Sequence, residues 1–204
     1  MPLHLRPAVE ADIDRINDVF FSGFAKDAAV SRCFPNKPSV REFLTTGHVR
    51  SIADPNVHKV VVVDTDLPDS PIIAYATWVA PHQPNPDEPE LPLYPPDGDD
   101  LALASFFFPY LKETREKDMA GRTFWHLATL VCHEEHQGRG AGKMLMRYGV
   151  EQADEMQADM YVEASPPGVP LYQRFGFKEV GRVTVLDGLH TELFMFRESP
   201  SAAA

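Results

Sequence analysis

The stretch that most constrains the fold is residues 125–143, which read WHLATLVCHEEHQGRGAGK. It begins as an apolar run rich in β-forming residues, continues through a short polar segment, and ends in alternating glycines before a stretch of helical periodicity. This order predicts a strand, a turn and a helix. Because glycine tolerates unusual backbone angles and has no Cβ, a turn over residues 137–142 can present several backbone N–H groups to a ligand. At the positive end of a helix, such groups form an anion-binding site.

Spacing separates this turn from the common nucleotide-binding loops. A Walker A loop requires glycine where Gln137 stands, and serine or threonine where Met144 stands. A dinucleotide fingerprint that begins at Gly138 requires glycine at the position of Lys143. The preceding HEEH, residues 133–136, is not the HExxH of metalloproteases, because its histidines are three positions apart. We therefore predict solvated polar loop residues there and no metal site.

Length, charge and cysteine usage favour one soluble domain, which we expect over residues 1–198, with residues 199–204 as a disordered tail. A chain of 204 residues can bury a core that needs no disulfides. Cys33 and Cys132, in a chain without a recognisable secretory signal, predict reduced thiols and a cytoplasmic protein. No apolar run approaches the ~20 residues that span a bilayer, so we expect no membrane partner. The net charge of −11 disfavours nucleic acid and anionic membranes.

The N-terminal half alternates strand and helix patterns. The expected elements are a strand at residues 3–6, an amphipathic helix at 10–25, a loop at 34–37, a helix from 39 to 52, and antiparallel strands at 57–64 and 72–79. Ser39 is the predicted N-cap of the second helix, because Glu42 follows it at the spacing of a capping box.

Residues 81–120 form an insertion before the central strand. Residues 81–100 are rich in proline and acidic residues, a composition typical of a loop, and residues 101–117 predict a helix interrupted near Pro109. The insertion is either a surface segment without a role in the site or a wall of the substrate site. After the glycine-rich turn we expect a helix, a strand at residues 160–164, a turn and short helix at 165–175, and strands at 179–185 and 191–197.

Three segments together resemble one known family. The turn contains Q-x-x-G-x-G at Gln137, Gly140 and Gly142, the strand before it reads LATLVC, and LYQRFGF follows at residues 171–177. In this order and distance they resemble the GCN5-related N-acetyltransferase (GNAT) superfamily, and more narrowly the branch that contains puromycin N-acetyltransferase. The resemblance implies an α/β (α+β) fold, with a mixed, mostly antiparallel, twisted sheet of about seven strands, splayed between strands 4 and 5 and flanked by helices.

The same resemblance implies acetyl-CoA as the co-substrate and supplies its binding residues. A bulge in the fourth strand would fall near Leu130 and Val131 and would direct the N–H of Cys132 toward the thioester. Ser165 occupies the position where many members have an asparagine that contacts the coenzyme. The turn that would hold the pyrophosphate, with its flanking cations, consists of Gln137, Gly138, Arg139, Gly140, Ala141, Gly142 and Lys143.

Acetyl transfer to an amine requires a neutral amine, a polarised thioester carbonyl and a proton for the leaving thiolate. The resemblance implies that Tyr172 protonates the thiolate. Two residues are alternatives for the base. His126 lies four positions before the predicted bulge, where the histone-acetylating branch has its catalytic glutamate, and Glu163 matches a glutamate of the puromycin branch. We expect direct transfer without an acetyl-enzyme, because Cys132 reads as a small buried residue rather than a nucleophile.

The preferred acceptor is a small-molecule amine, since the apolar residues 101–110 could line a pocket for an aromatic or aliphatic body. A protein or peptide acetyltransferase is an alternative, because the acidic residues of segment 81–100 could attract a basic peptide. A third alternative is a protein module that binds and senses the coenzyme without catalysing acetyl transfer. The protein could act as a monomer or a homodimer.

Overall fold

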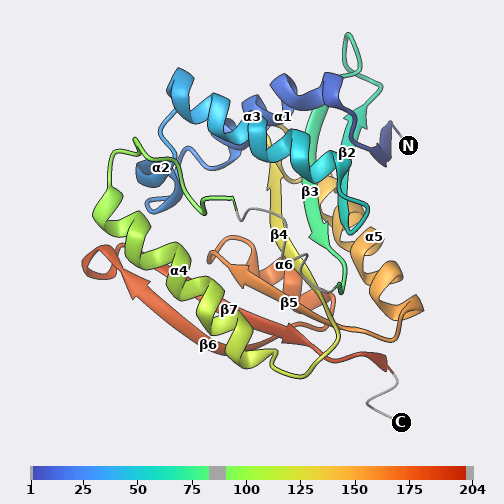
Figure 1. Cartoon of the computed structure of the whole chain (residues 1–204). Helices are drawn as coiled ribbons and strands as arrows, with labels where there is room; N and C mark the ends of the chain where they lie inside the picture. The colour runs from blue at the N-terminus through green and yellow to red at the C-terminus, as the bar shows by residue number, and fades with distance from the viewer. Residues whose placement is uncertain (1, 83–90, 201–204) are drawn as a thin grey trace.

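A computed structural model describes residues 2–82 and 91–200. Within these residues the strands form a seven-stranded sheet in the order β1-β2-β3-β4-β5-β7-β6. Every neighbouring pair is antiparallel except β4 and β5. This mixed, mostly antiparallel sheet flanked by helices confirms the predicted fold class (Figure 1). The strands are β1 Leu3–Pro7, β2 Val57–Asp64, β3 Ile72–Val79, β4 Phe124–Cys132, β5 Asp159–Ala164, β6 Lys178–Val185 and β7 His190–Arg197.

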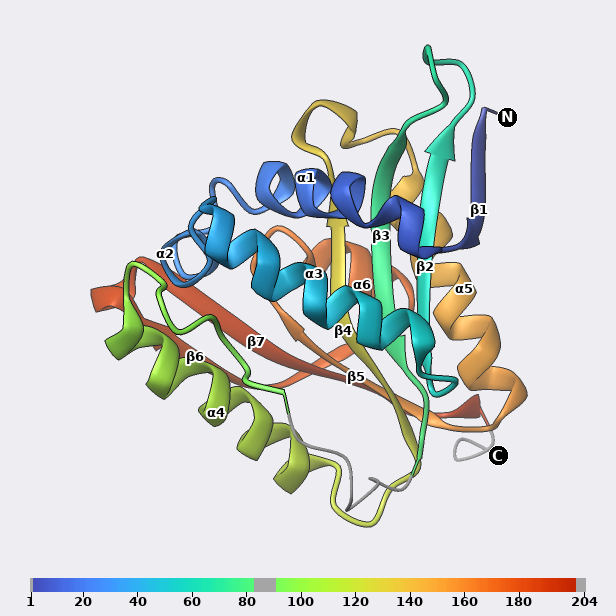
Figure 2. The same cartoon turned by 45° about the horizontal axis from the view of Figure 1, so that its top comes forward.

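Helices cover both faces of the sheet (Figure 2). The α-helices are α1 Ile13–Gly23, α2 Val30–Cys33, α3 Pro38–Ala53, α4 Leu101–Asp118, α5 Ala141–Glu155 and α6 Val169–Arg174; 3-10 turns are η1 Glu10–Asp12, η2 Glu134–His136 and η3 Leu186–Gly188. On one face, α1 and α3 lie over the β1 to β4 half and α4 lies over the β5 to β7 half. On the other face, α5 and α6 pack on the main core.

The continuous apolar run in β2 follows from burial on both faces. Val60 and Val62 belong to the core under α5, whereas Val61 belongs to the core under α1 and α3. A strand covered on both sides needs apolar residues at successive positions rather than at alternate ones. The predicted bounds of both β2 and β3 are confirmed.

The sheet splays between β4 and β5. Residue pairs run from Phe124 with Asp159 to Leu127 with Val162 and stop there. Beyond that point β4 stays paired with β3 as far as Cys132, and β5 stays paired with β7 as far as Ala164. The two strands therefore separate toward their C-terminal ends, as the resemblance implied.

The β4 bulge lies earlier than predicted. Thr77 pairs with Thr129 and Trp78 pairs with Leu127, so Ala128 is the extra residue, and the predicted position near Leu130 and Val131 is wrong. Trp78 is fully buried and packs so closely on α5 that a Cβ on Gly149 would lie 2.2 Å from its ring. Trp78 is held in this way, and the register of β4 against β3 shifts by one residue directly after the pair of Trp78 with Leu127.

Two local predictions are corrected at helices. The helix α3 begins at Pro38 with Lys37 as its N-cap, and the hydroxyl of Ser39 donates a hydrogen bond to Asp97 instead of capping the helix. Proline is favoured at the first helical position, because its φ is already set and its missing N–H would have no helical partner. The helix α4 continues through Pro109, since its buried residues Leu103, Ala104 and Phe107 hold it against the sheet. The sequence also missed α2, within a stretch too short for helical periodicity.

Both cysteines are free thiols. No helix among the described residues is long and apolar enough to cross a membrane. Near the C-terminus, Ser199 is buried and its backbone N–H donates to Asp159 at 2.9 Å. Residues 83–90 of the predicted insertion and residues 201–204 of the predicted tail lie outside the described residues.

Candidate active site

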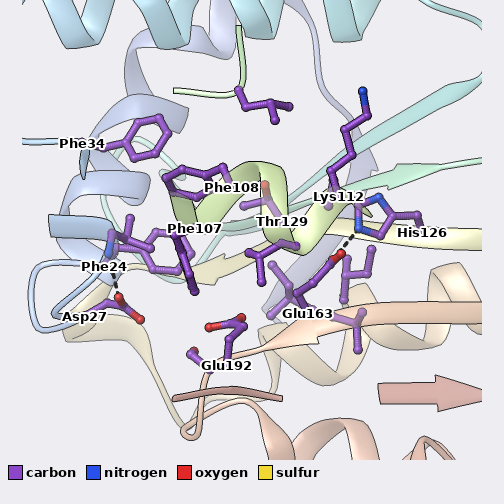
Figure 3. Close-up of a pocket in the computed structure, with 18 of the residues that line it drawn as sticks. Phe24, Asp27, Phe34, Phe107, Phe108, Lys112, His126, Thr129, Glu163 and Glu192 are labelled. Carbon is purple, nitrogen blue, oxygen red and sulfur yellow. Dashed lines mark hydrogen bonds and ion pairs between the residues drawn. The ribbon is translucent and has the colours of Figure 1, made fainter. Parts of the chain in front are cut away.

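A cavity of about 430 Å³ opens where β4 and β5 separate. Ala128, Thr129 and Leu130 of β4 line it, together with Glu163 and Ser165 at the end of β5 and Tyr172 of α6. Glu192 of β7 lies across from them (Figure 3). Phenylalanines from the helical side complete the wall, namely Phe20, Phe24, Phe34, Phe43, Phe107 and Phe108. The result is an apolar pocket with a few polar groups at the splay, the usual form of a small-molecule site.

The two predicted bases contact each other in this cavity. His126 Nε2 lies 2.7 Å from one carboxylate oxygen of Glu163. Arg115 of α4 forms an ion pair with the other oxygen, and its guanidinium nitrogen lies 3.2 Å from His126 Nε2. Both oxygens of Glu163 are therefore occupied. Sequence reasoning missed Arg115, because its pairing with β5 depends on how α4 packs across the sheet.

The pKa values of this pair move in the same direction for different reasons. Burial alone would raise the pKa of Glu163, but attraction and hydrogen bonds from His126 and Arg115 outweigh it and lower the pKa to about 2. Burial lowers the pKa of His126, and Arg115 adds to this while Glu163 opposes it. At neutral pH this favours a neutral imidazole beside an ionised carboxylate. In that state Nε2 donates its proton to Glu163, and Nδ1 keeps a free lone pair.

Tyr172 reaches the cavity from the opposite side of the sheet. Its ring fits because residue 168 is glycine, where a Cβ would lie 2.8 Å from the ring. Burial raises the pKa of its phenol, and the nearby carboxylate of Glu192 raises it further. The hydroxyl therefore keeps its proton at neutral pH. Ser165 also lines the cavity, and its carbonyl accepts a hydrogen bond from Gly168 N–H in the turn before α6.

The glycine-rich turn precedes α5 as predicted and is open to solvent. Gly138 and Gly140 have φ values of 75° and 97°, in the left-handed region where glycine is favoured. A Cβ on either residue would meet nothing within 4 Å, so the space beside the backbone is free for a ligand. Gly142 instead packs on Leu171, and Ala141 is buried. The turn and the start of α5 thus have the form of an anion site.

The predicted cations of this turn differ in their surroundings. Arg139 forms an ion pair with Asp64, a fully buried carboxylate at the end of β2. Lys143 is exposed on α5. Gln137 donates from Nε2 to the carbonyl of Cys132 at 3.4 Å, which connects the turn to the end of β4. Arg139 therefore anchors the turn, and Lys143 is the more accessible positive charge.

Of the three β4 residues predicted to contact the coenzyme, Leu130 lines the cavity, and Val131 and Cys132 do not. All three residues pair with β3, along the edge of β4 that faces away from β5. Burial raises the pKa of the Cys132 thiol to about 11, so the thiolate form is scarce at neutral pH. Cys132 is only partly buried, and its lack of a nucleophilic role stays a prediction.

Three polar residues of the cavity region were missed by sequence reasoning. His190 and Glu192 of β7 lie 2.9 Å apart, from Nε2 to Oε2, and His190 Nδ1 lies 3.5 Å from Asp27 Oδ1 in the loop after α1. Asp27 and Glu192 both line the cavity. The only sequence signal is that residues 190 and 192 share one face of a strand. Separately, His133, Glu135 and His136 have potential metal-ligand atoms within 4.8 Å of one another, in the polar turn before the glycines.

Comparisons with known proteins agree with this geometry. Residues 112–192 match the family model of the acetyltransferase (GNAT) domain. An acetyltransferase from Stachybotrys chartarum is 25% identical over 211 residues, which cover 95% of this chain and 88% of the relative. The matched segment runs from α4 to β7 and contains the glycine-rich turn, so this part of the chain is similar to the family that the sequence resembles.

Two solved structures illustrate the shared fold. One is described as histone acetyltransferase HPA2 and related acetyltransferase, from Corynebacterium glutamicum; it has a TM-score of 0.64 and 21% identity, covering 98% of this chain and 97% of that one. The other is yncA from Salmonella typhimurium, solved with its cofactor acetyl-CoA; it has a TM-score of 0.60 and 15% identity, covering 100% and 98% of the two chains. The narrower resemblance to the puromycin branch stays a prediction.

Proposed function

We propose that the protein transfers the acetyl group of acetyl-CoA to the amine of a small molecule. The observation that carries this proposal is the cavity at the splay, which His126, Glu163 and Tyr172 line, together with the open glycine-rich turn that follows β4. The similar fold of yncA, which was solved with acetyl-CoA, supports the choice of donor.

The coenzyme would lie along the edge of β4 that β5 leaves unpaired. Its pyrophosphate would accept hydrogen bonds from the N–H groups of residues 138–142, with Lys143 nearby for the phosphates. Gln137 and Arg139 would hold the turn in shape through Cys132 and Asp64. The pantetheine arm would follow Leu130, Val131 and Cys132 toward the cavity, where the Ser165 hydroxyl could contact it.

The reaction would proceed in one direct transfer. The neutral amine attacks the thioester carbonyl, a C–N bond forms, the C–S bond breaks, and Tyr172 gives its proton to the departing thiolate. An alkylammonium has a pKa near ~10.4, so presenting the neutral amine at pH 7 costs roughly 4–5 kcal/mol. A base that accepts the ammonium proton lowers this cost.

His126 is the better candidate for that base, and Glu163 would position it. Both oxygens of Glu163 already contact Arg115 and His126, and its low pKa makes it a weak proton acceptor. The lone pair on Nδ1 of His126 can accept the proton, while Glu163 fixes the ring and stabilises the imidazolium that forms. Arg115 keeps Glu163 ionised for this role.

A small acceptor is favoured by the size and lining of the cavity. Its volume of about 430 Å³ and its phenylalanine walls fit one apolar body of modest size. A peptide acceptor would require an open groove instead. Purified protein should therefore release CoA from acetyl-CoA with small aromatic or aliphatic amines and not with lysine-bearing peptides. The opposite preference would favour a protein or peptide acetyltransferase.

Variants at two residues separate catalysis from coenzyme sensing. We expect His126→Gln and Tyr172→Phe each to lower kcat by about 10²-fold or more, the usual contribution of a general base or acid, without weakening acetyl-CoA binding. Calorimetry would measure the binding, and thiol release the turnover. Tight acetyl-CoA binding without turnover for any acceptor, and without an effect of Tyr172→Phe, would instead identify a coenzyme sensor.

A further inference from the structure

Three polar residues, of which His190 and Glu192 are buried and Asp27 is partly buried, form a chain of contacts at one end of the cavity. Glu192 Oε2 lies 2.9 Å from His190 Nε2, and His190 Nδ1 lies 3.5 Å from Asp27 Oδ1. The same Asp27 oxygen accepts hydrogen bonds from the N–H groups of Ala29 and Val30 at 3.0 and 2.8 Å, so the start of α2 holds it in place. Phe107 packs edge-on against the His190 ring. Glu192 is thus positioned by two further residues, themselves fixed by the fold.

This chain presents negative charge to the cavity. Burial lowers the pKa of His190, but its hydrogen bond to Glu192 and its attraction to Asp27 and Glu192 outweigh burial and raise the pKa. One imidazole thus faces two carboxylates, Asp27 and Glu192; burial raises the pKa of Glu192, and His190 opposes that effect. The other facing groups do not balance these carboxylates, because Tyr172 is neutral and Glu163 is already paired with Arg115 and His126. Lys112, also in the lining, points away from Glu192 in Figure 3.

Glu192 is the member of the chain that can contact a ligand. It lines the cavity together with Asp27, and only its Oε2 has a hydrogen-bond partner among the described residues. Its neighbours in the lining include Tyr172, whose pKa its charge raises. A cation placed against the free oxygen would lie in the cavity that Tyr172 also lines, where the acetyl group is expected. A buried carboxylate with an unfilled position binds cations strongly, because water competes weakly there.

We propose that Glu192, positioned by His190 and Asp27, binds the ammonium group of the acceptor and makes the site selective for amines that lack a carboxylate. The acceptor class is a primary amine on an aromatic or branched aliphatic body, which would occupy the phenylalanine-lined part of the cavity. A carboxylate beside the amine, as in an amino acid, would be repelled by Glu192 and Asp27. The inference rests on the proposed function for the identity of the reacting group, but the binding site can be tested without turnover.

The test measures binding of matched ligand pairs without acetyl-CoA. The pairs are 2-phenylethylamine with phenylalanine, tyramine with tyrosine, and isoamylamine with leucine, and in each pair the two compounds differ only in the α-carboxylate. We expect the wild-type protein to bind at least one amine about tenfold or more tightly than its amino acid, by calorimetry at constant ionic strength. Equal affinities within every pair, or no amine binding at all, would overturn the proposal.

A variant then assigns the selectivity to Glu192. Glu192→Gln keeps the shape and can still accept a hydrogen bond from His190, and we expect it to weaken binding of the preferred amine about tenfold. Acetyl-CoA affinity should not change. Glu198→Gln, the same substitution at an exposed position just beyond β7, is the matched control and should bind amines like the wild type. Retained amine affinity in Glu192→Gln would contradict the inference.

Kinetics distinguish this inference from the proposed function. In Glu192→Gln we expect KM for the amine to rise about tenfold while kcat changes less than threefold. A loss of kcat with unchanged KM would contradict a binding role. If amines are acetylated but Glu192→Gln behaves like the wild type, the inference fails and the proposed function stands. If amines bind through Glu192 but no CoA is released, the proposed function fails and the binding site stands.

Discussion

Two glutamates face the same cavity with opposite tendencies to bind a proton. Glu163 contacts two cationic partners, Arg115 and His126, and its pKa is lowered to about 2. Burial raises the pKa of Glu192, and a single imidazole only partly offsets that effect. The same residue type is therefore suited to the two roles proposed, one fixing His126 and the other facing the acceptor. Environment decides the role of each carboxyl group.

Lys59 is a buried cation outside the site. Its ammonium donates to Thr77 Oγ1 at 2.6 Å and lies 5.3 Å from the centre of the Tyr75 ring. Burial lowers its pKa from 10.5 to about 7. Between pH 7 and 10.5 the unfolded chain binds a proton that the folded protein does not. Stability therefore rises with pH across this window, because the unfolded state binds more protons.

Lys59→Met should remove this pH dependence. Methionine has a similar length and no charge, so we expect the variant to be more stable at pH 7 by about 2 kcal/mol, as replacement of buried charges by apolar residues often is. Urea unfolding of both proteins from pH 7 to 10 would measure the difference, which should shrink as pH rises. Lys178→Met, at an exposed lysine of β6, is the control and should leave the slope unchanged. An equal slope in Lys59→Met and wild type would contradict the pKa argument.

The sequence predicted the site residues that lie within local motifs and missed those brought in by packing. His126, Glu163 and Tyr172 follow from short segments that resemble a family, and the structure places all three at one cavity. Their roles stay predictions. Arg115 and Glu192 lie in no recognisable sequence motif. They matter because of their contacts with residues that are distant in the sequence. Such contacts depend on how α4 and β7 pack, which no local pattern encodes.

Among the elements, the strands were predicted best where apolar runs have clear boundaries. β2 and β3 are runs of β-forming residues that end at a turn, so their limits could be read directly. The bulge in β4 could not, since its place depends on how the partner strand is held by Trp78 and α5. At the start of α3, two signals competed, and Pro38 set the first turn rather than the predicted cap at Ser39.

The junction of the glycine-rich turn with α5 offers a matched pair of substitutions. Gly140 has a φ of 97° with open space beside it, and Gly47, in α3, also has open space. Gly140→Ala should destabilise the protein by about 1 kcal/mol, because the left-handed conformation costs that much for alanine. It should also weaken acetyl-CoA binding, since the methyl group would occupy the space proposed for the pyrophosphate.

Gly47→Ala should have the opposite effect on stability. Alanine is favoured over glycine inside a helix by about 1 kcal/mol, and α3 lies on the face of the sheet opposite α5. Thermal unfolding and calorimetry with acetyl-CoA would compare the two variants. If Gly140→Ala binds acetyl-CoA as tightly as Gly47→Ala does, the pyrophosphate does not lie against this turn.

At the scale of the whole molecule, the sheet consists of two halves that share one core but are joined by few strand pairs. β4 and β5 share only the pairs from Phe124 with Asp159 to Leu127 with Val162. The proposed coenzyme would lie in the gap beyond these pairs and contact both halves. Ligand binding should therefore change the stability of this junction more than that of either half alone.

Acetyl-CoA at 100 times its Kd should stabilise the protein by about 2.7 kcal/mol, a rise in Tm of roughly 5–10 °C. Hydrogen exchange should show added protection for the amides of β4 beyond Leu127 and for those of β5. Adenosine 3′,5′-bisphosphate, which lacks the pantetheine arm, is the control and should protect the glycine-rich turn alone. Equal protection by both ligands would place the arm outside the gap.

The position of α4 has a consequence for protein engineering. This helix supplies Phe107, Phe108 and Arg115 to the cavity, yet it packs on the face of the sheet opposite α5 and the glycine-rich turn. If the proposed function holds, libraries confined to the cavity side of α4 should change the range of acceptors while leaving the proposed coenzyme site intact. Selection on new amines could begin from Phe107 and Phe108, with Arg115 held constant to keep His126 in place.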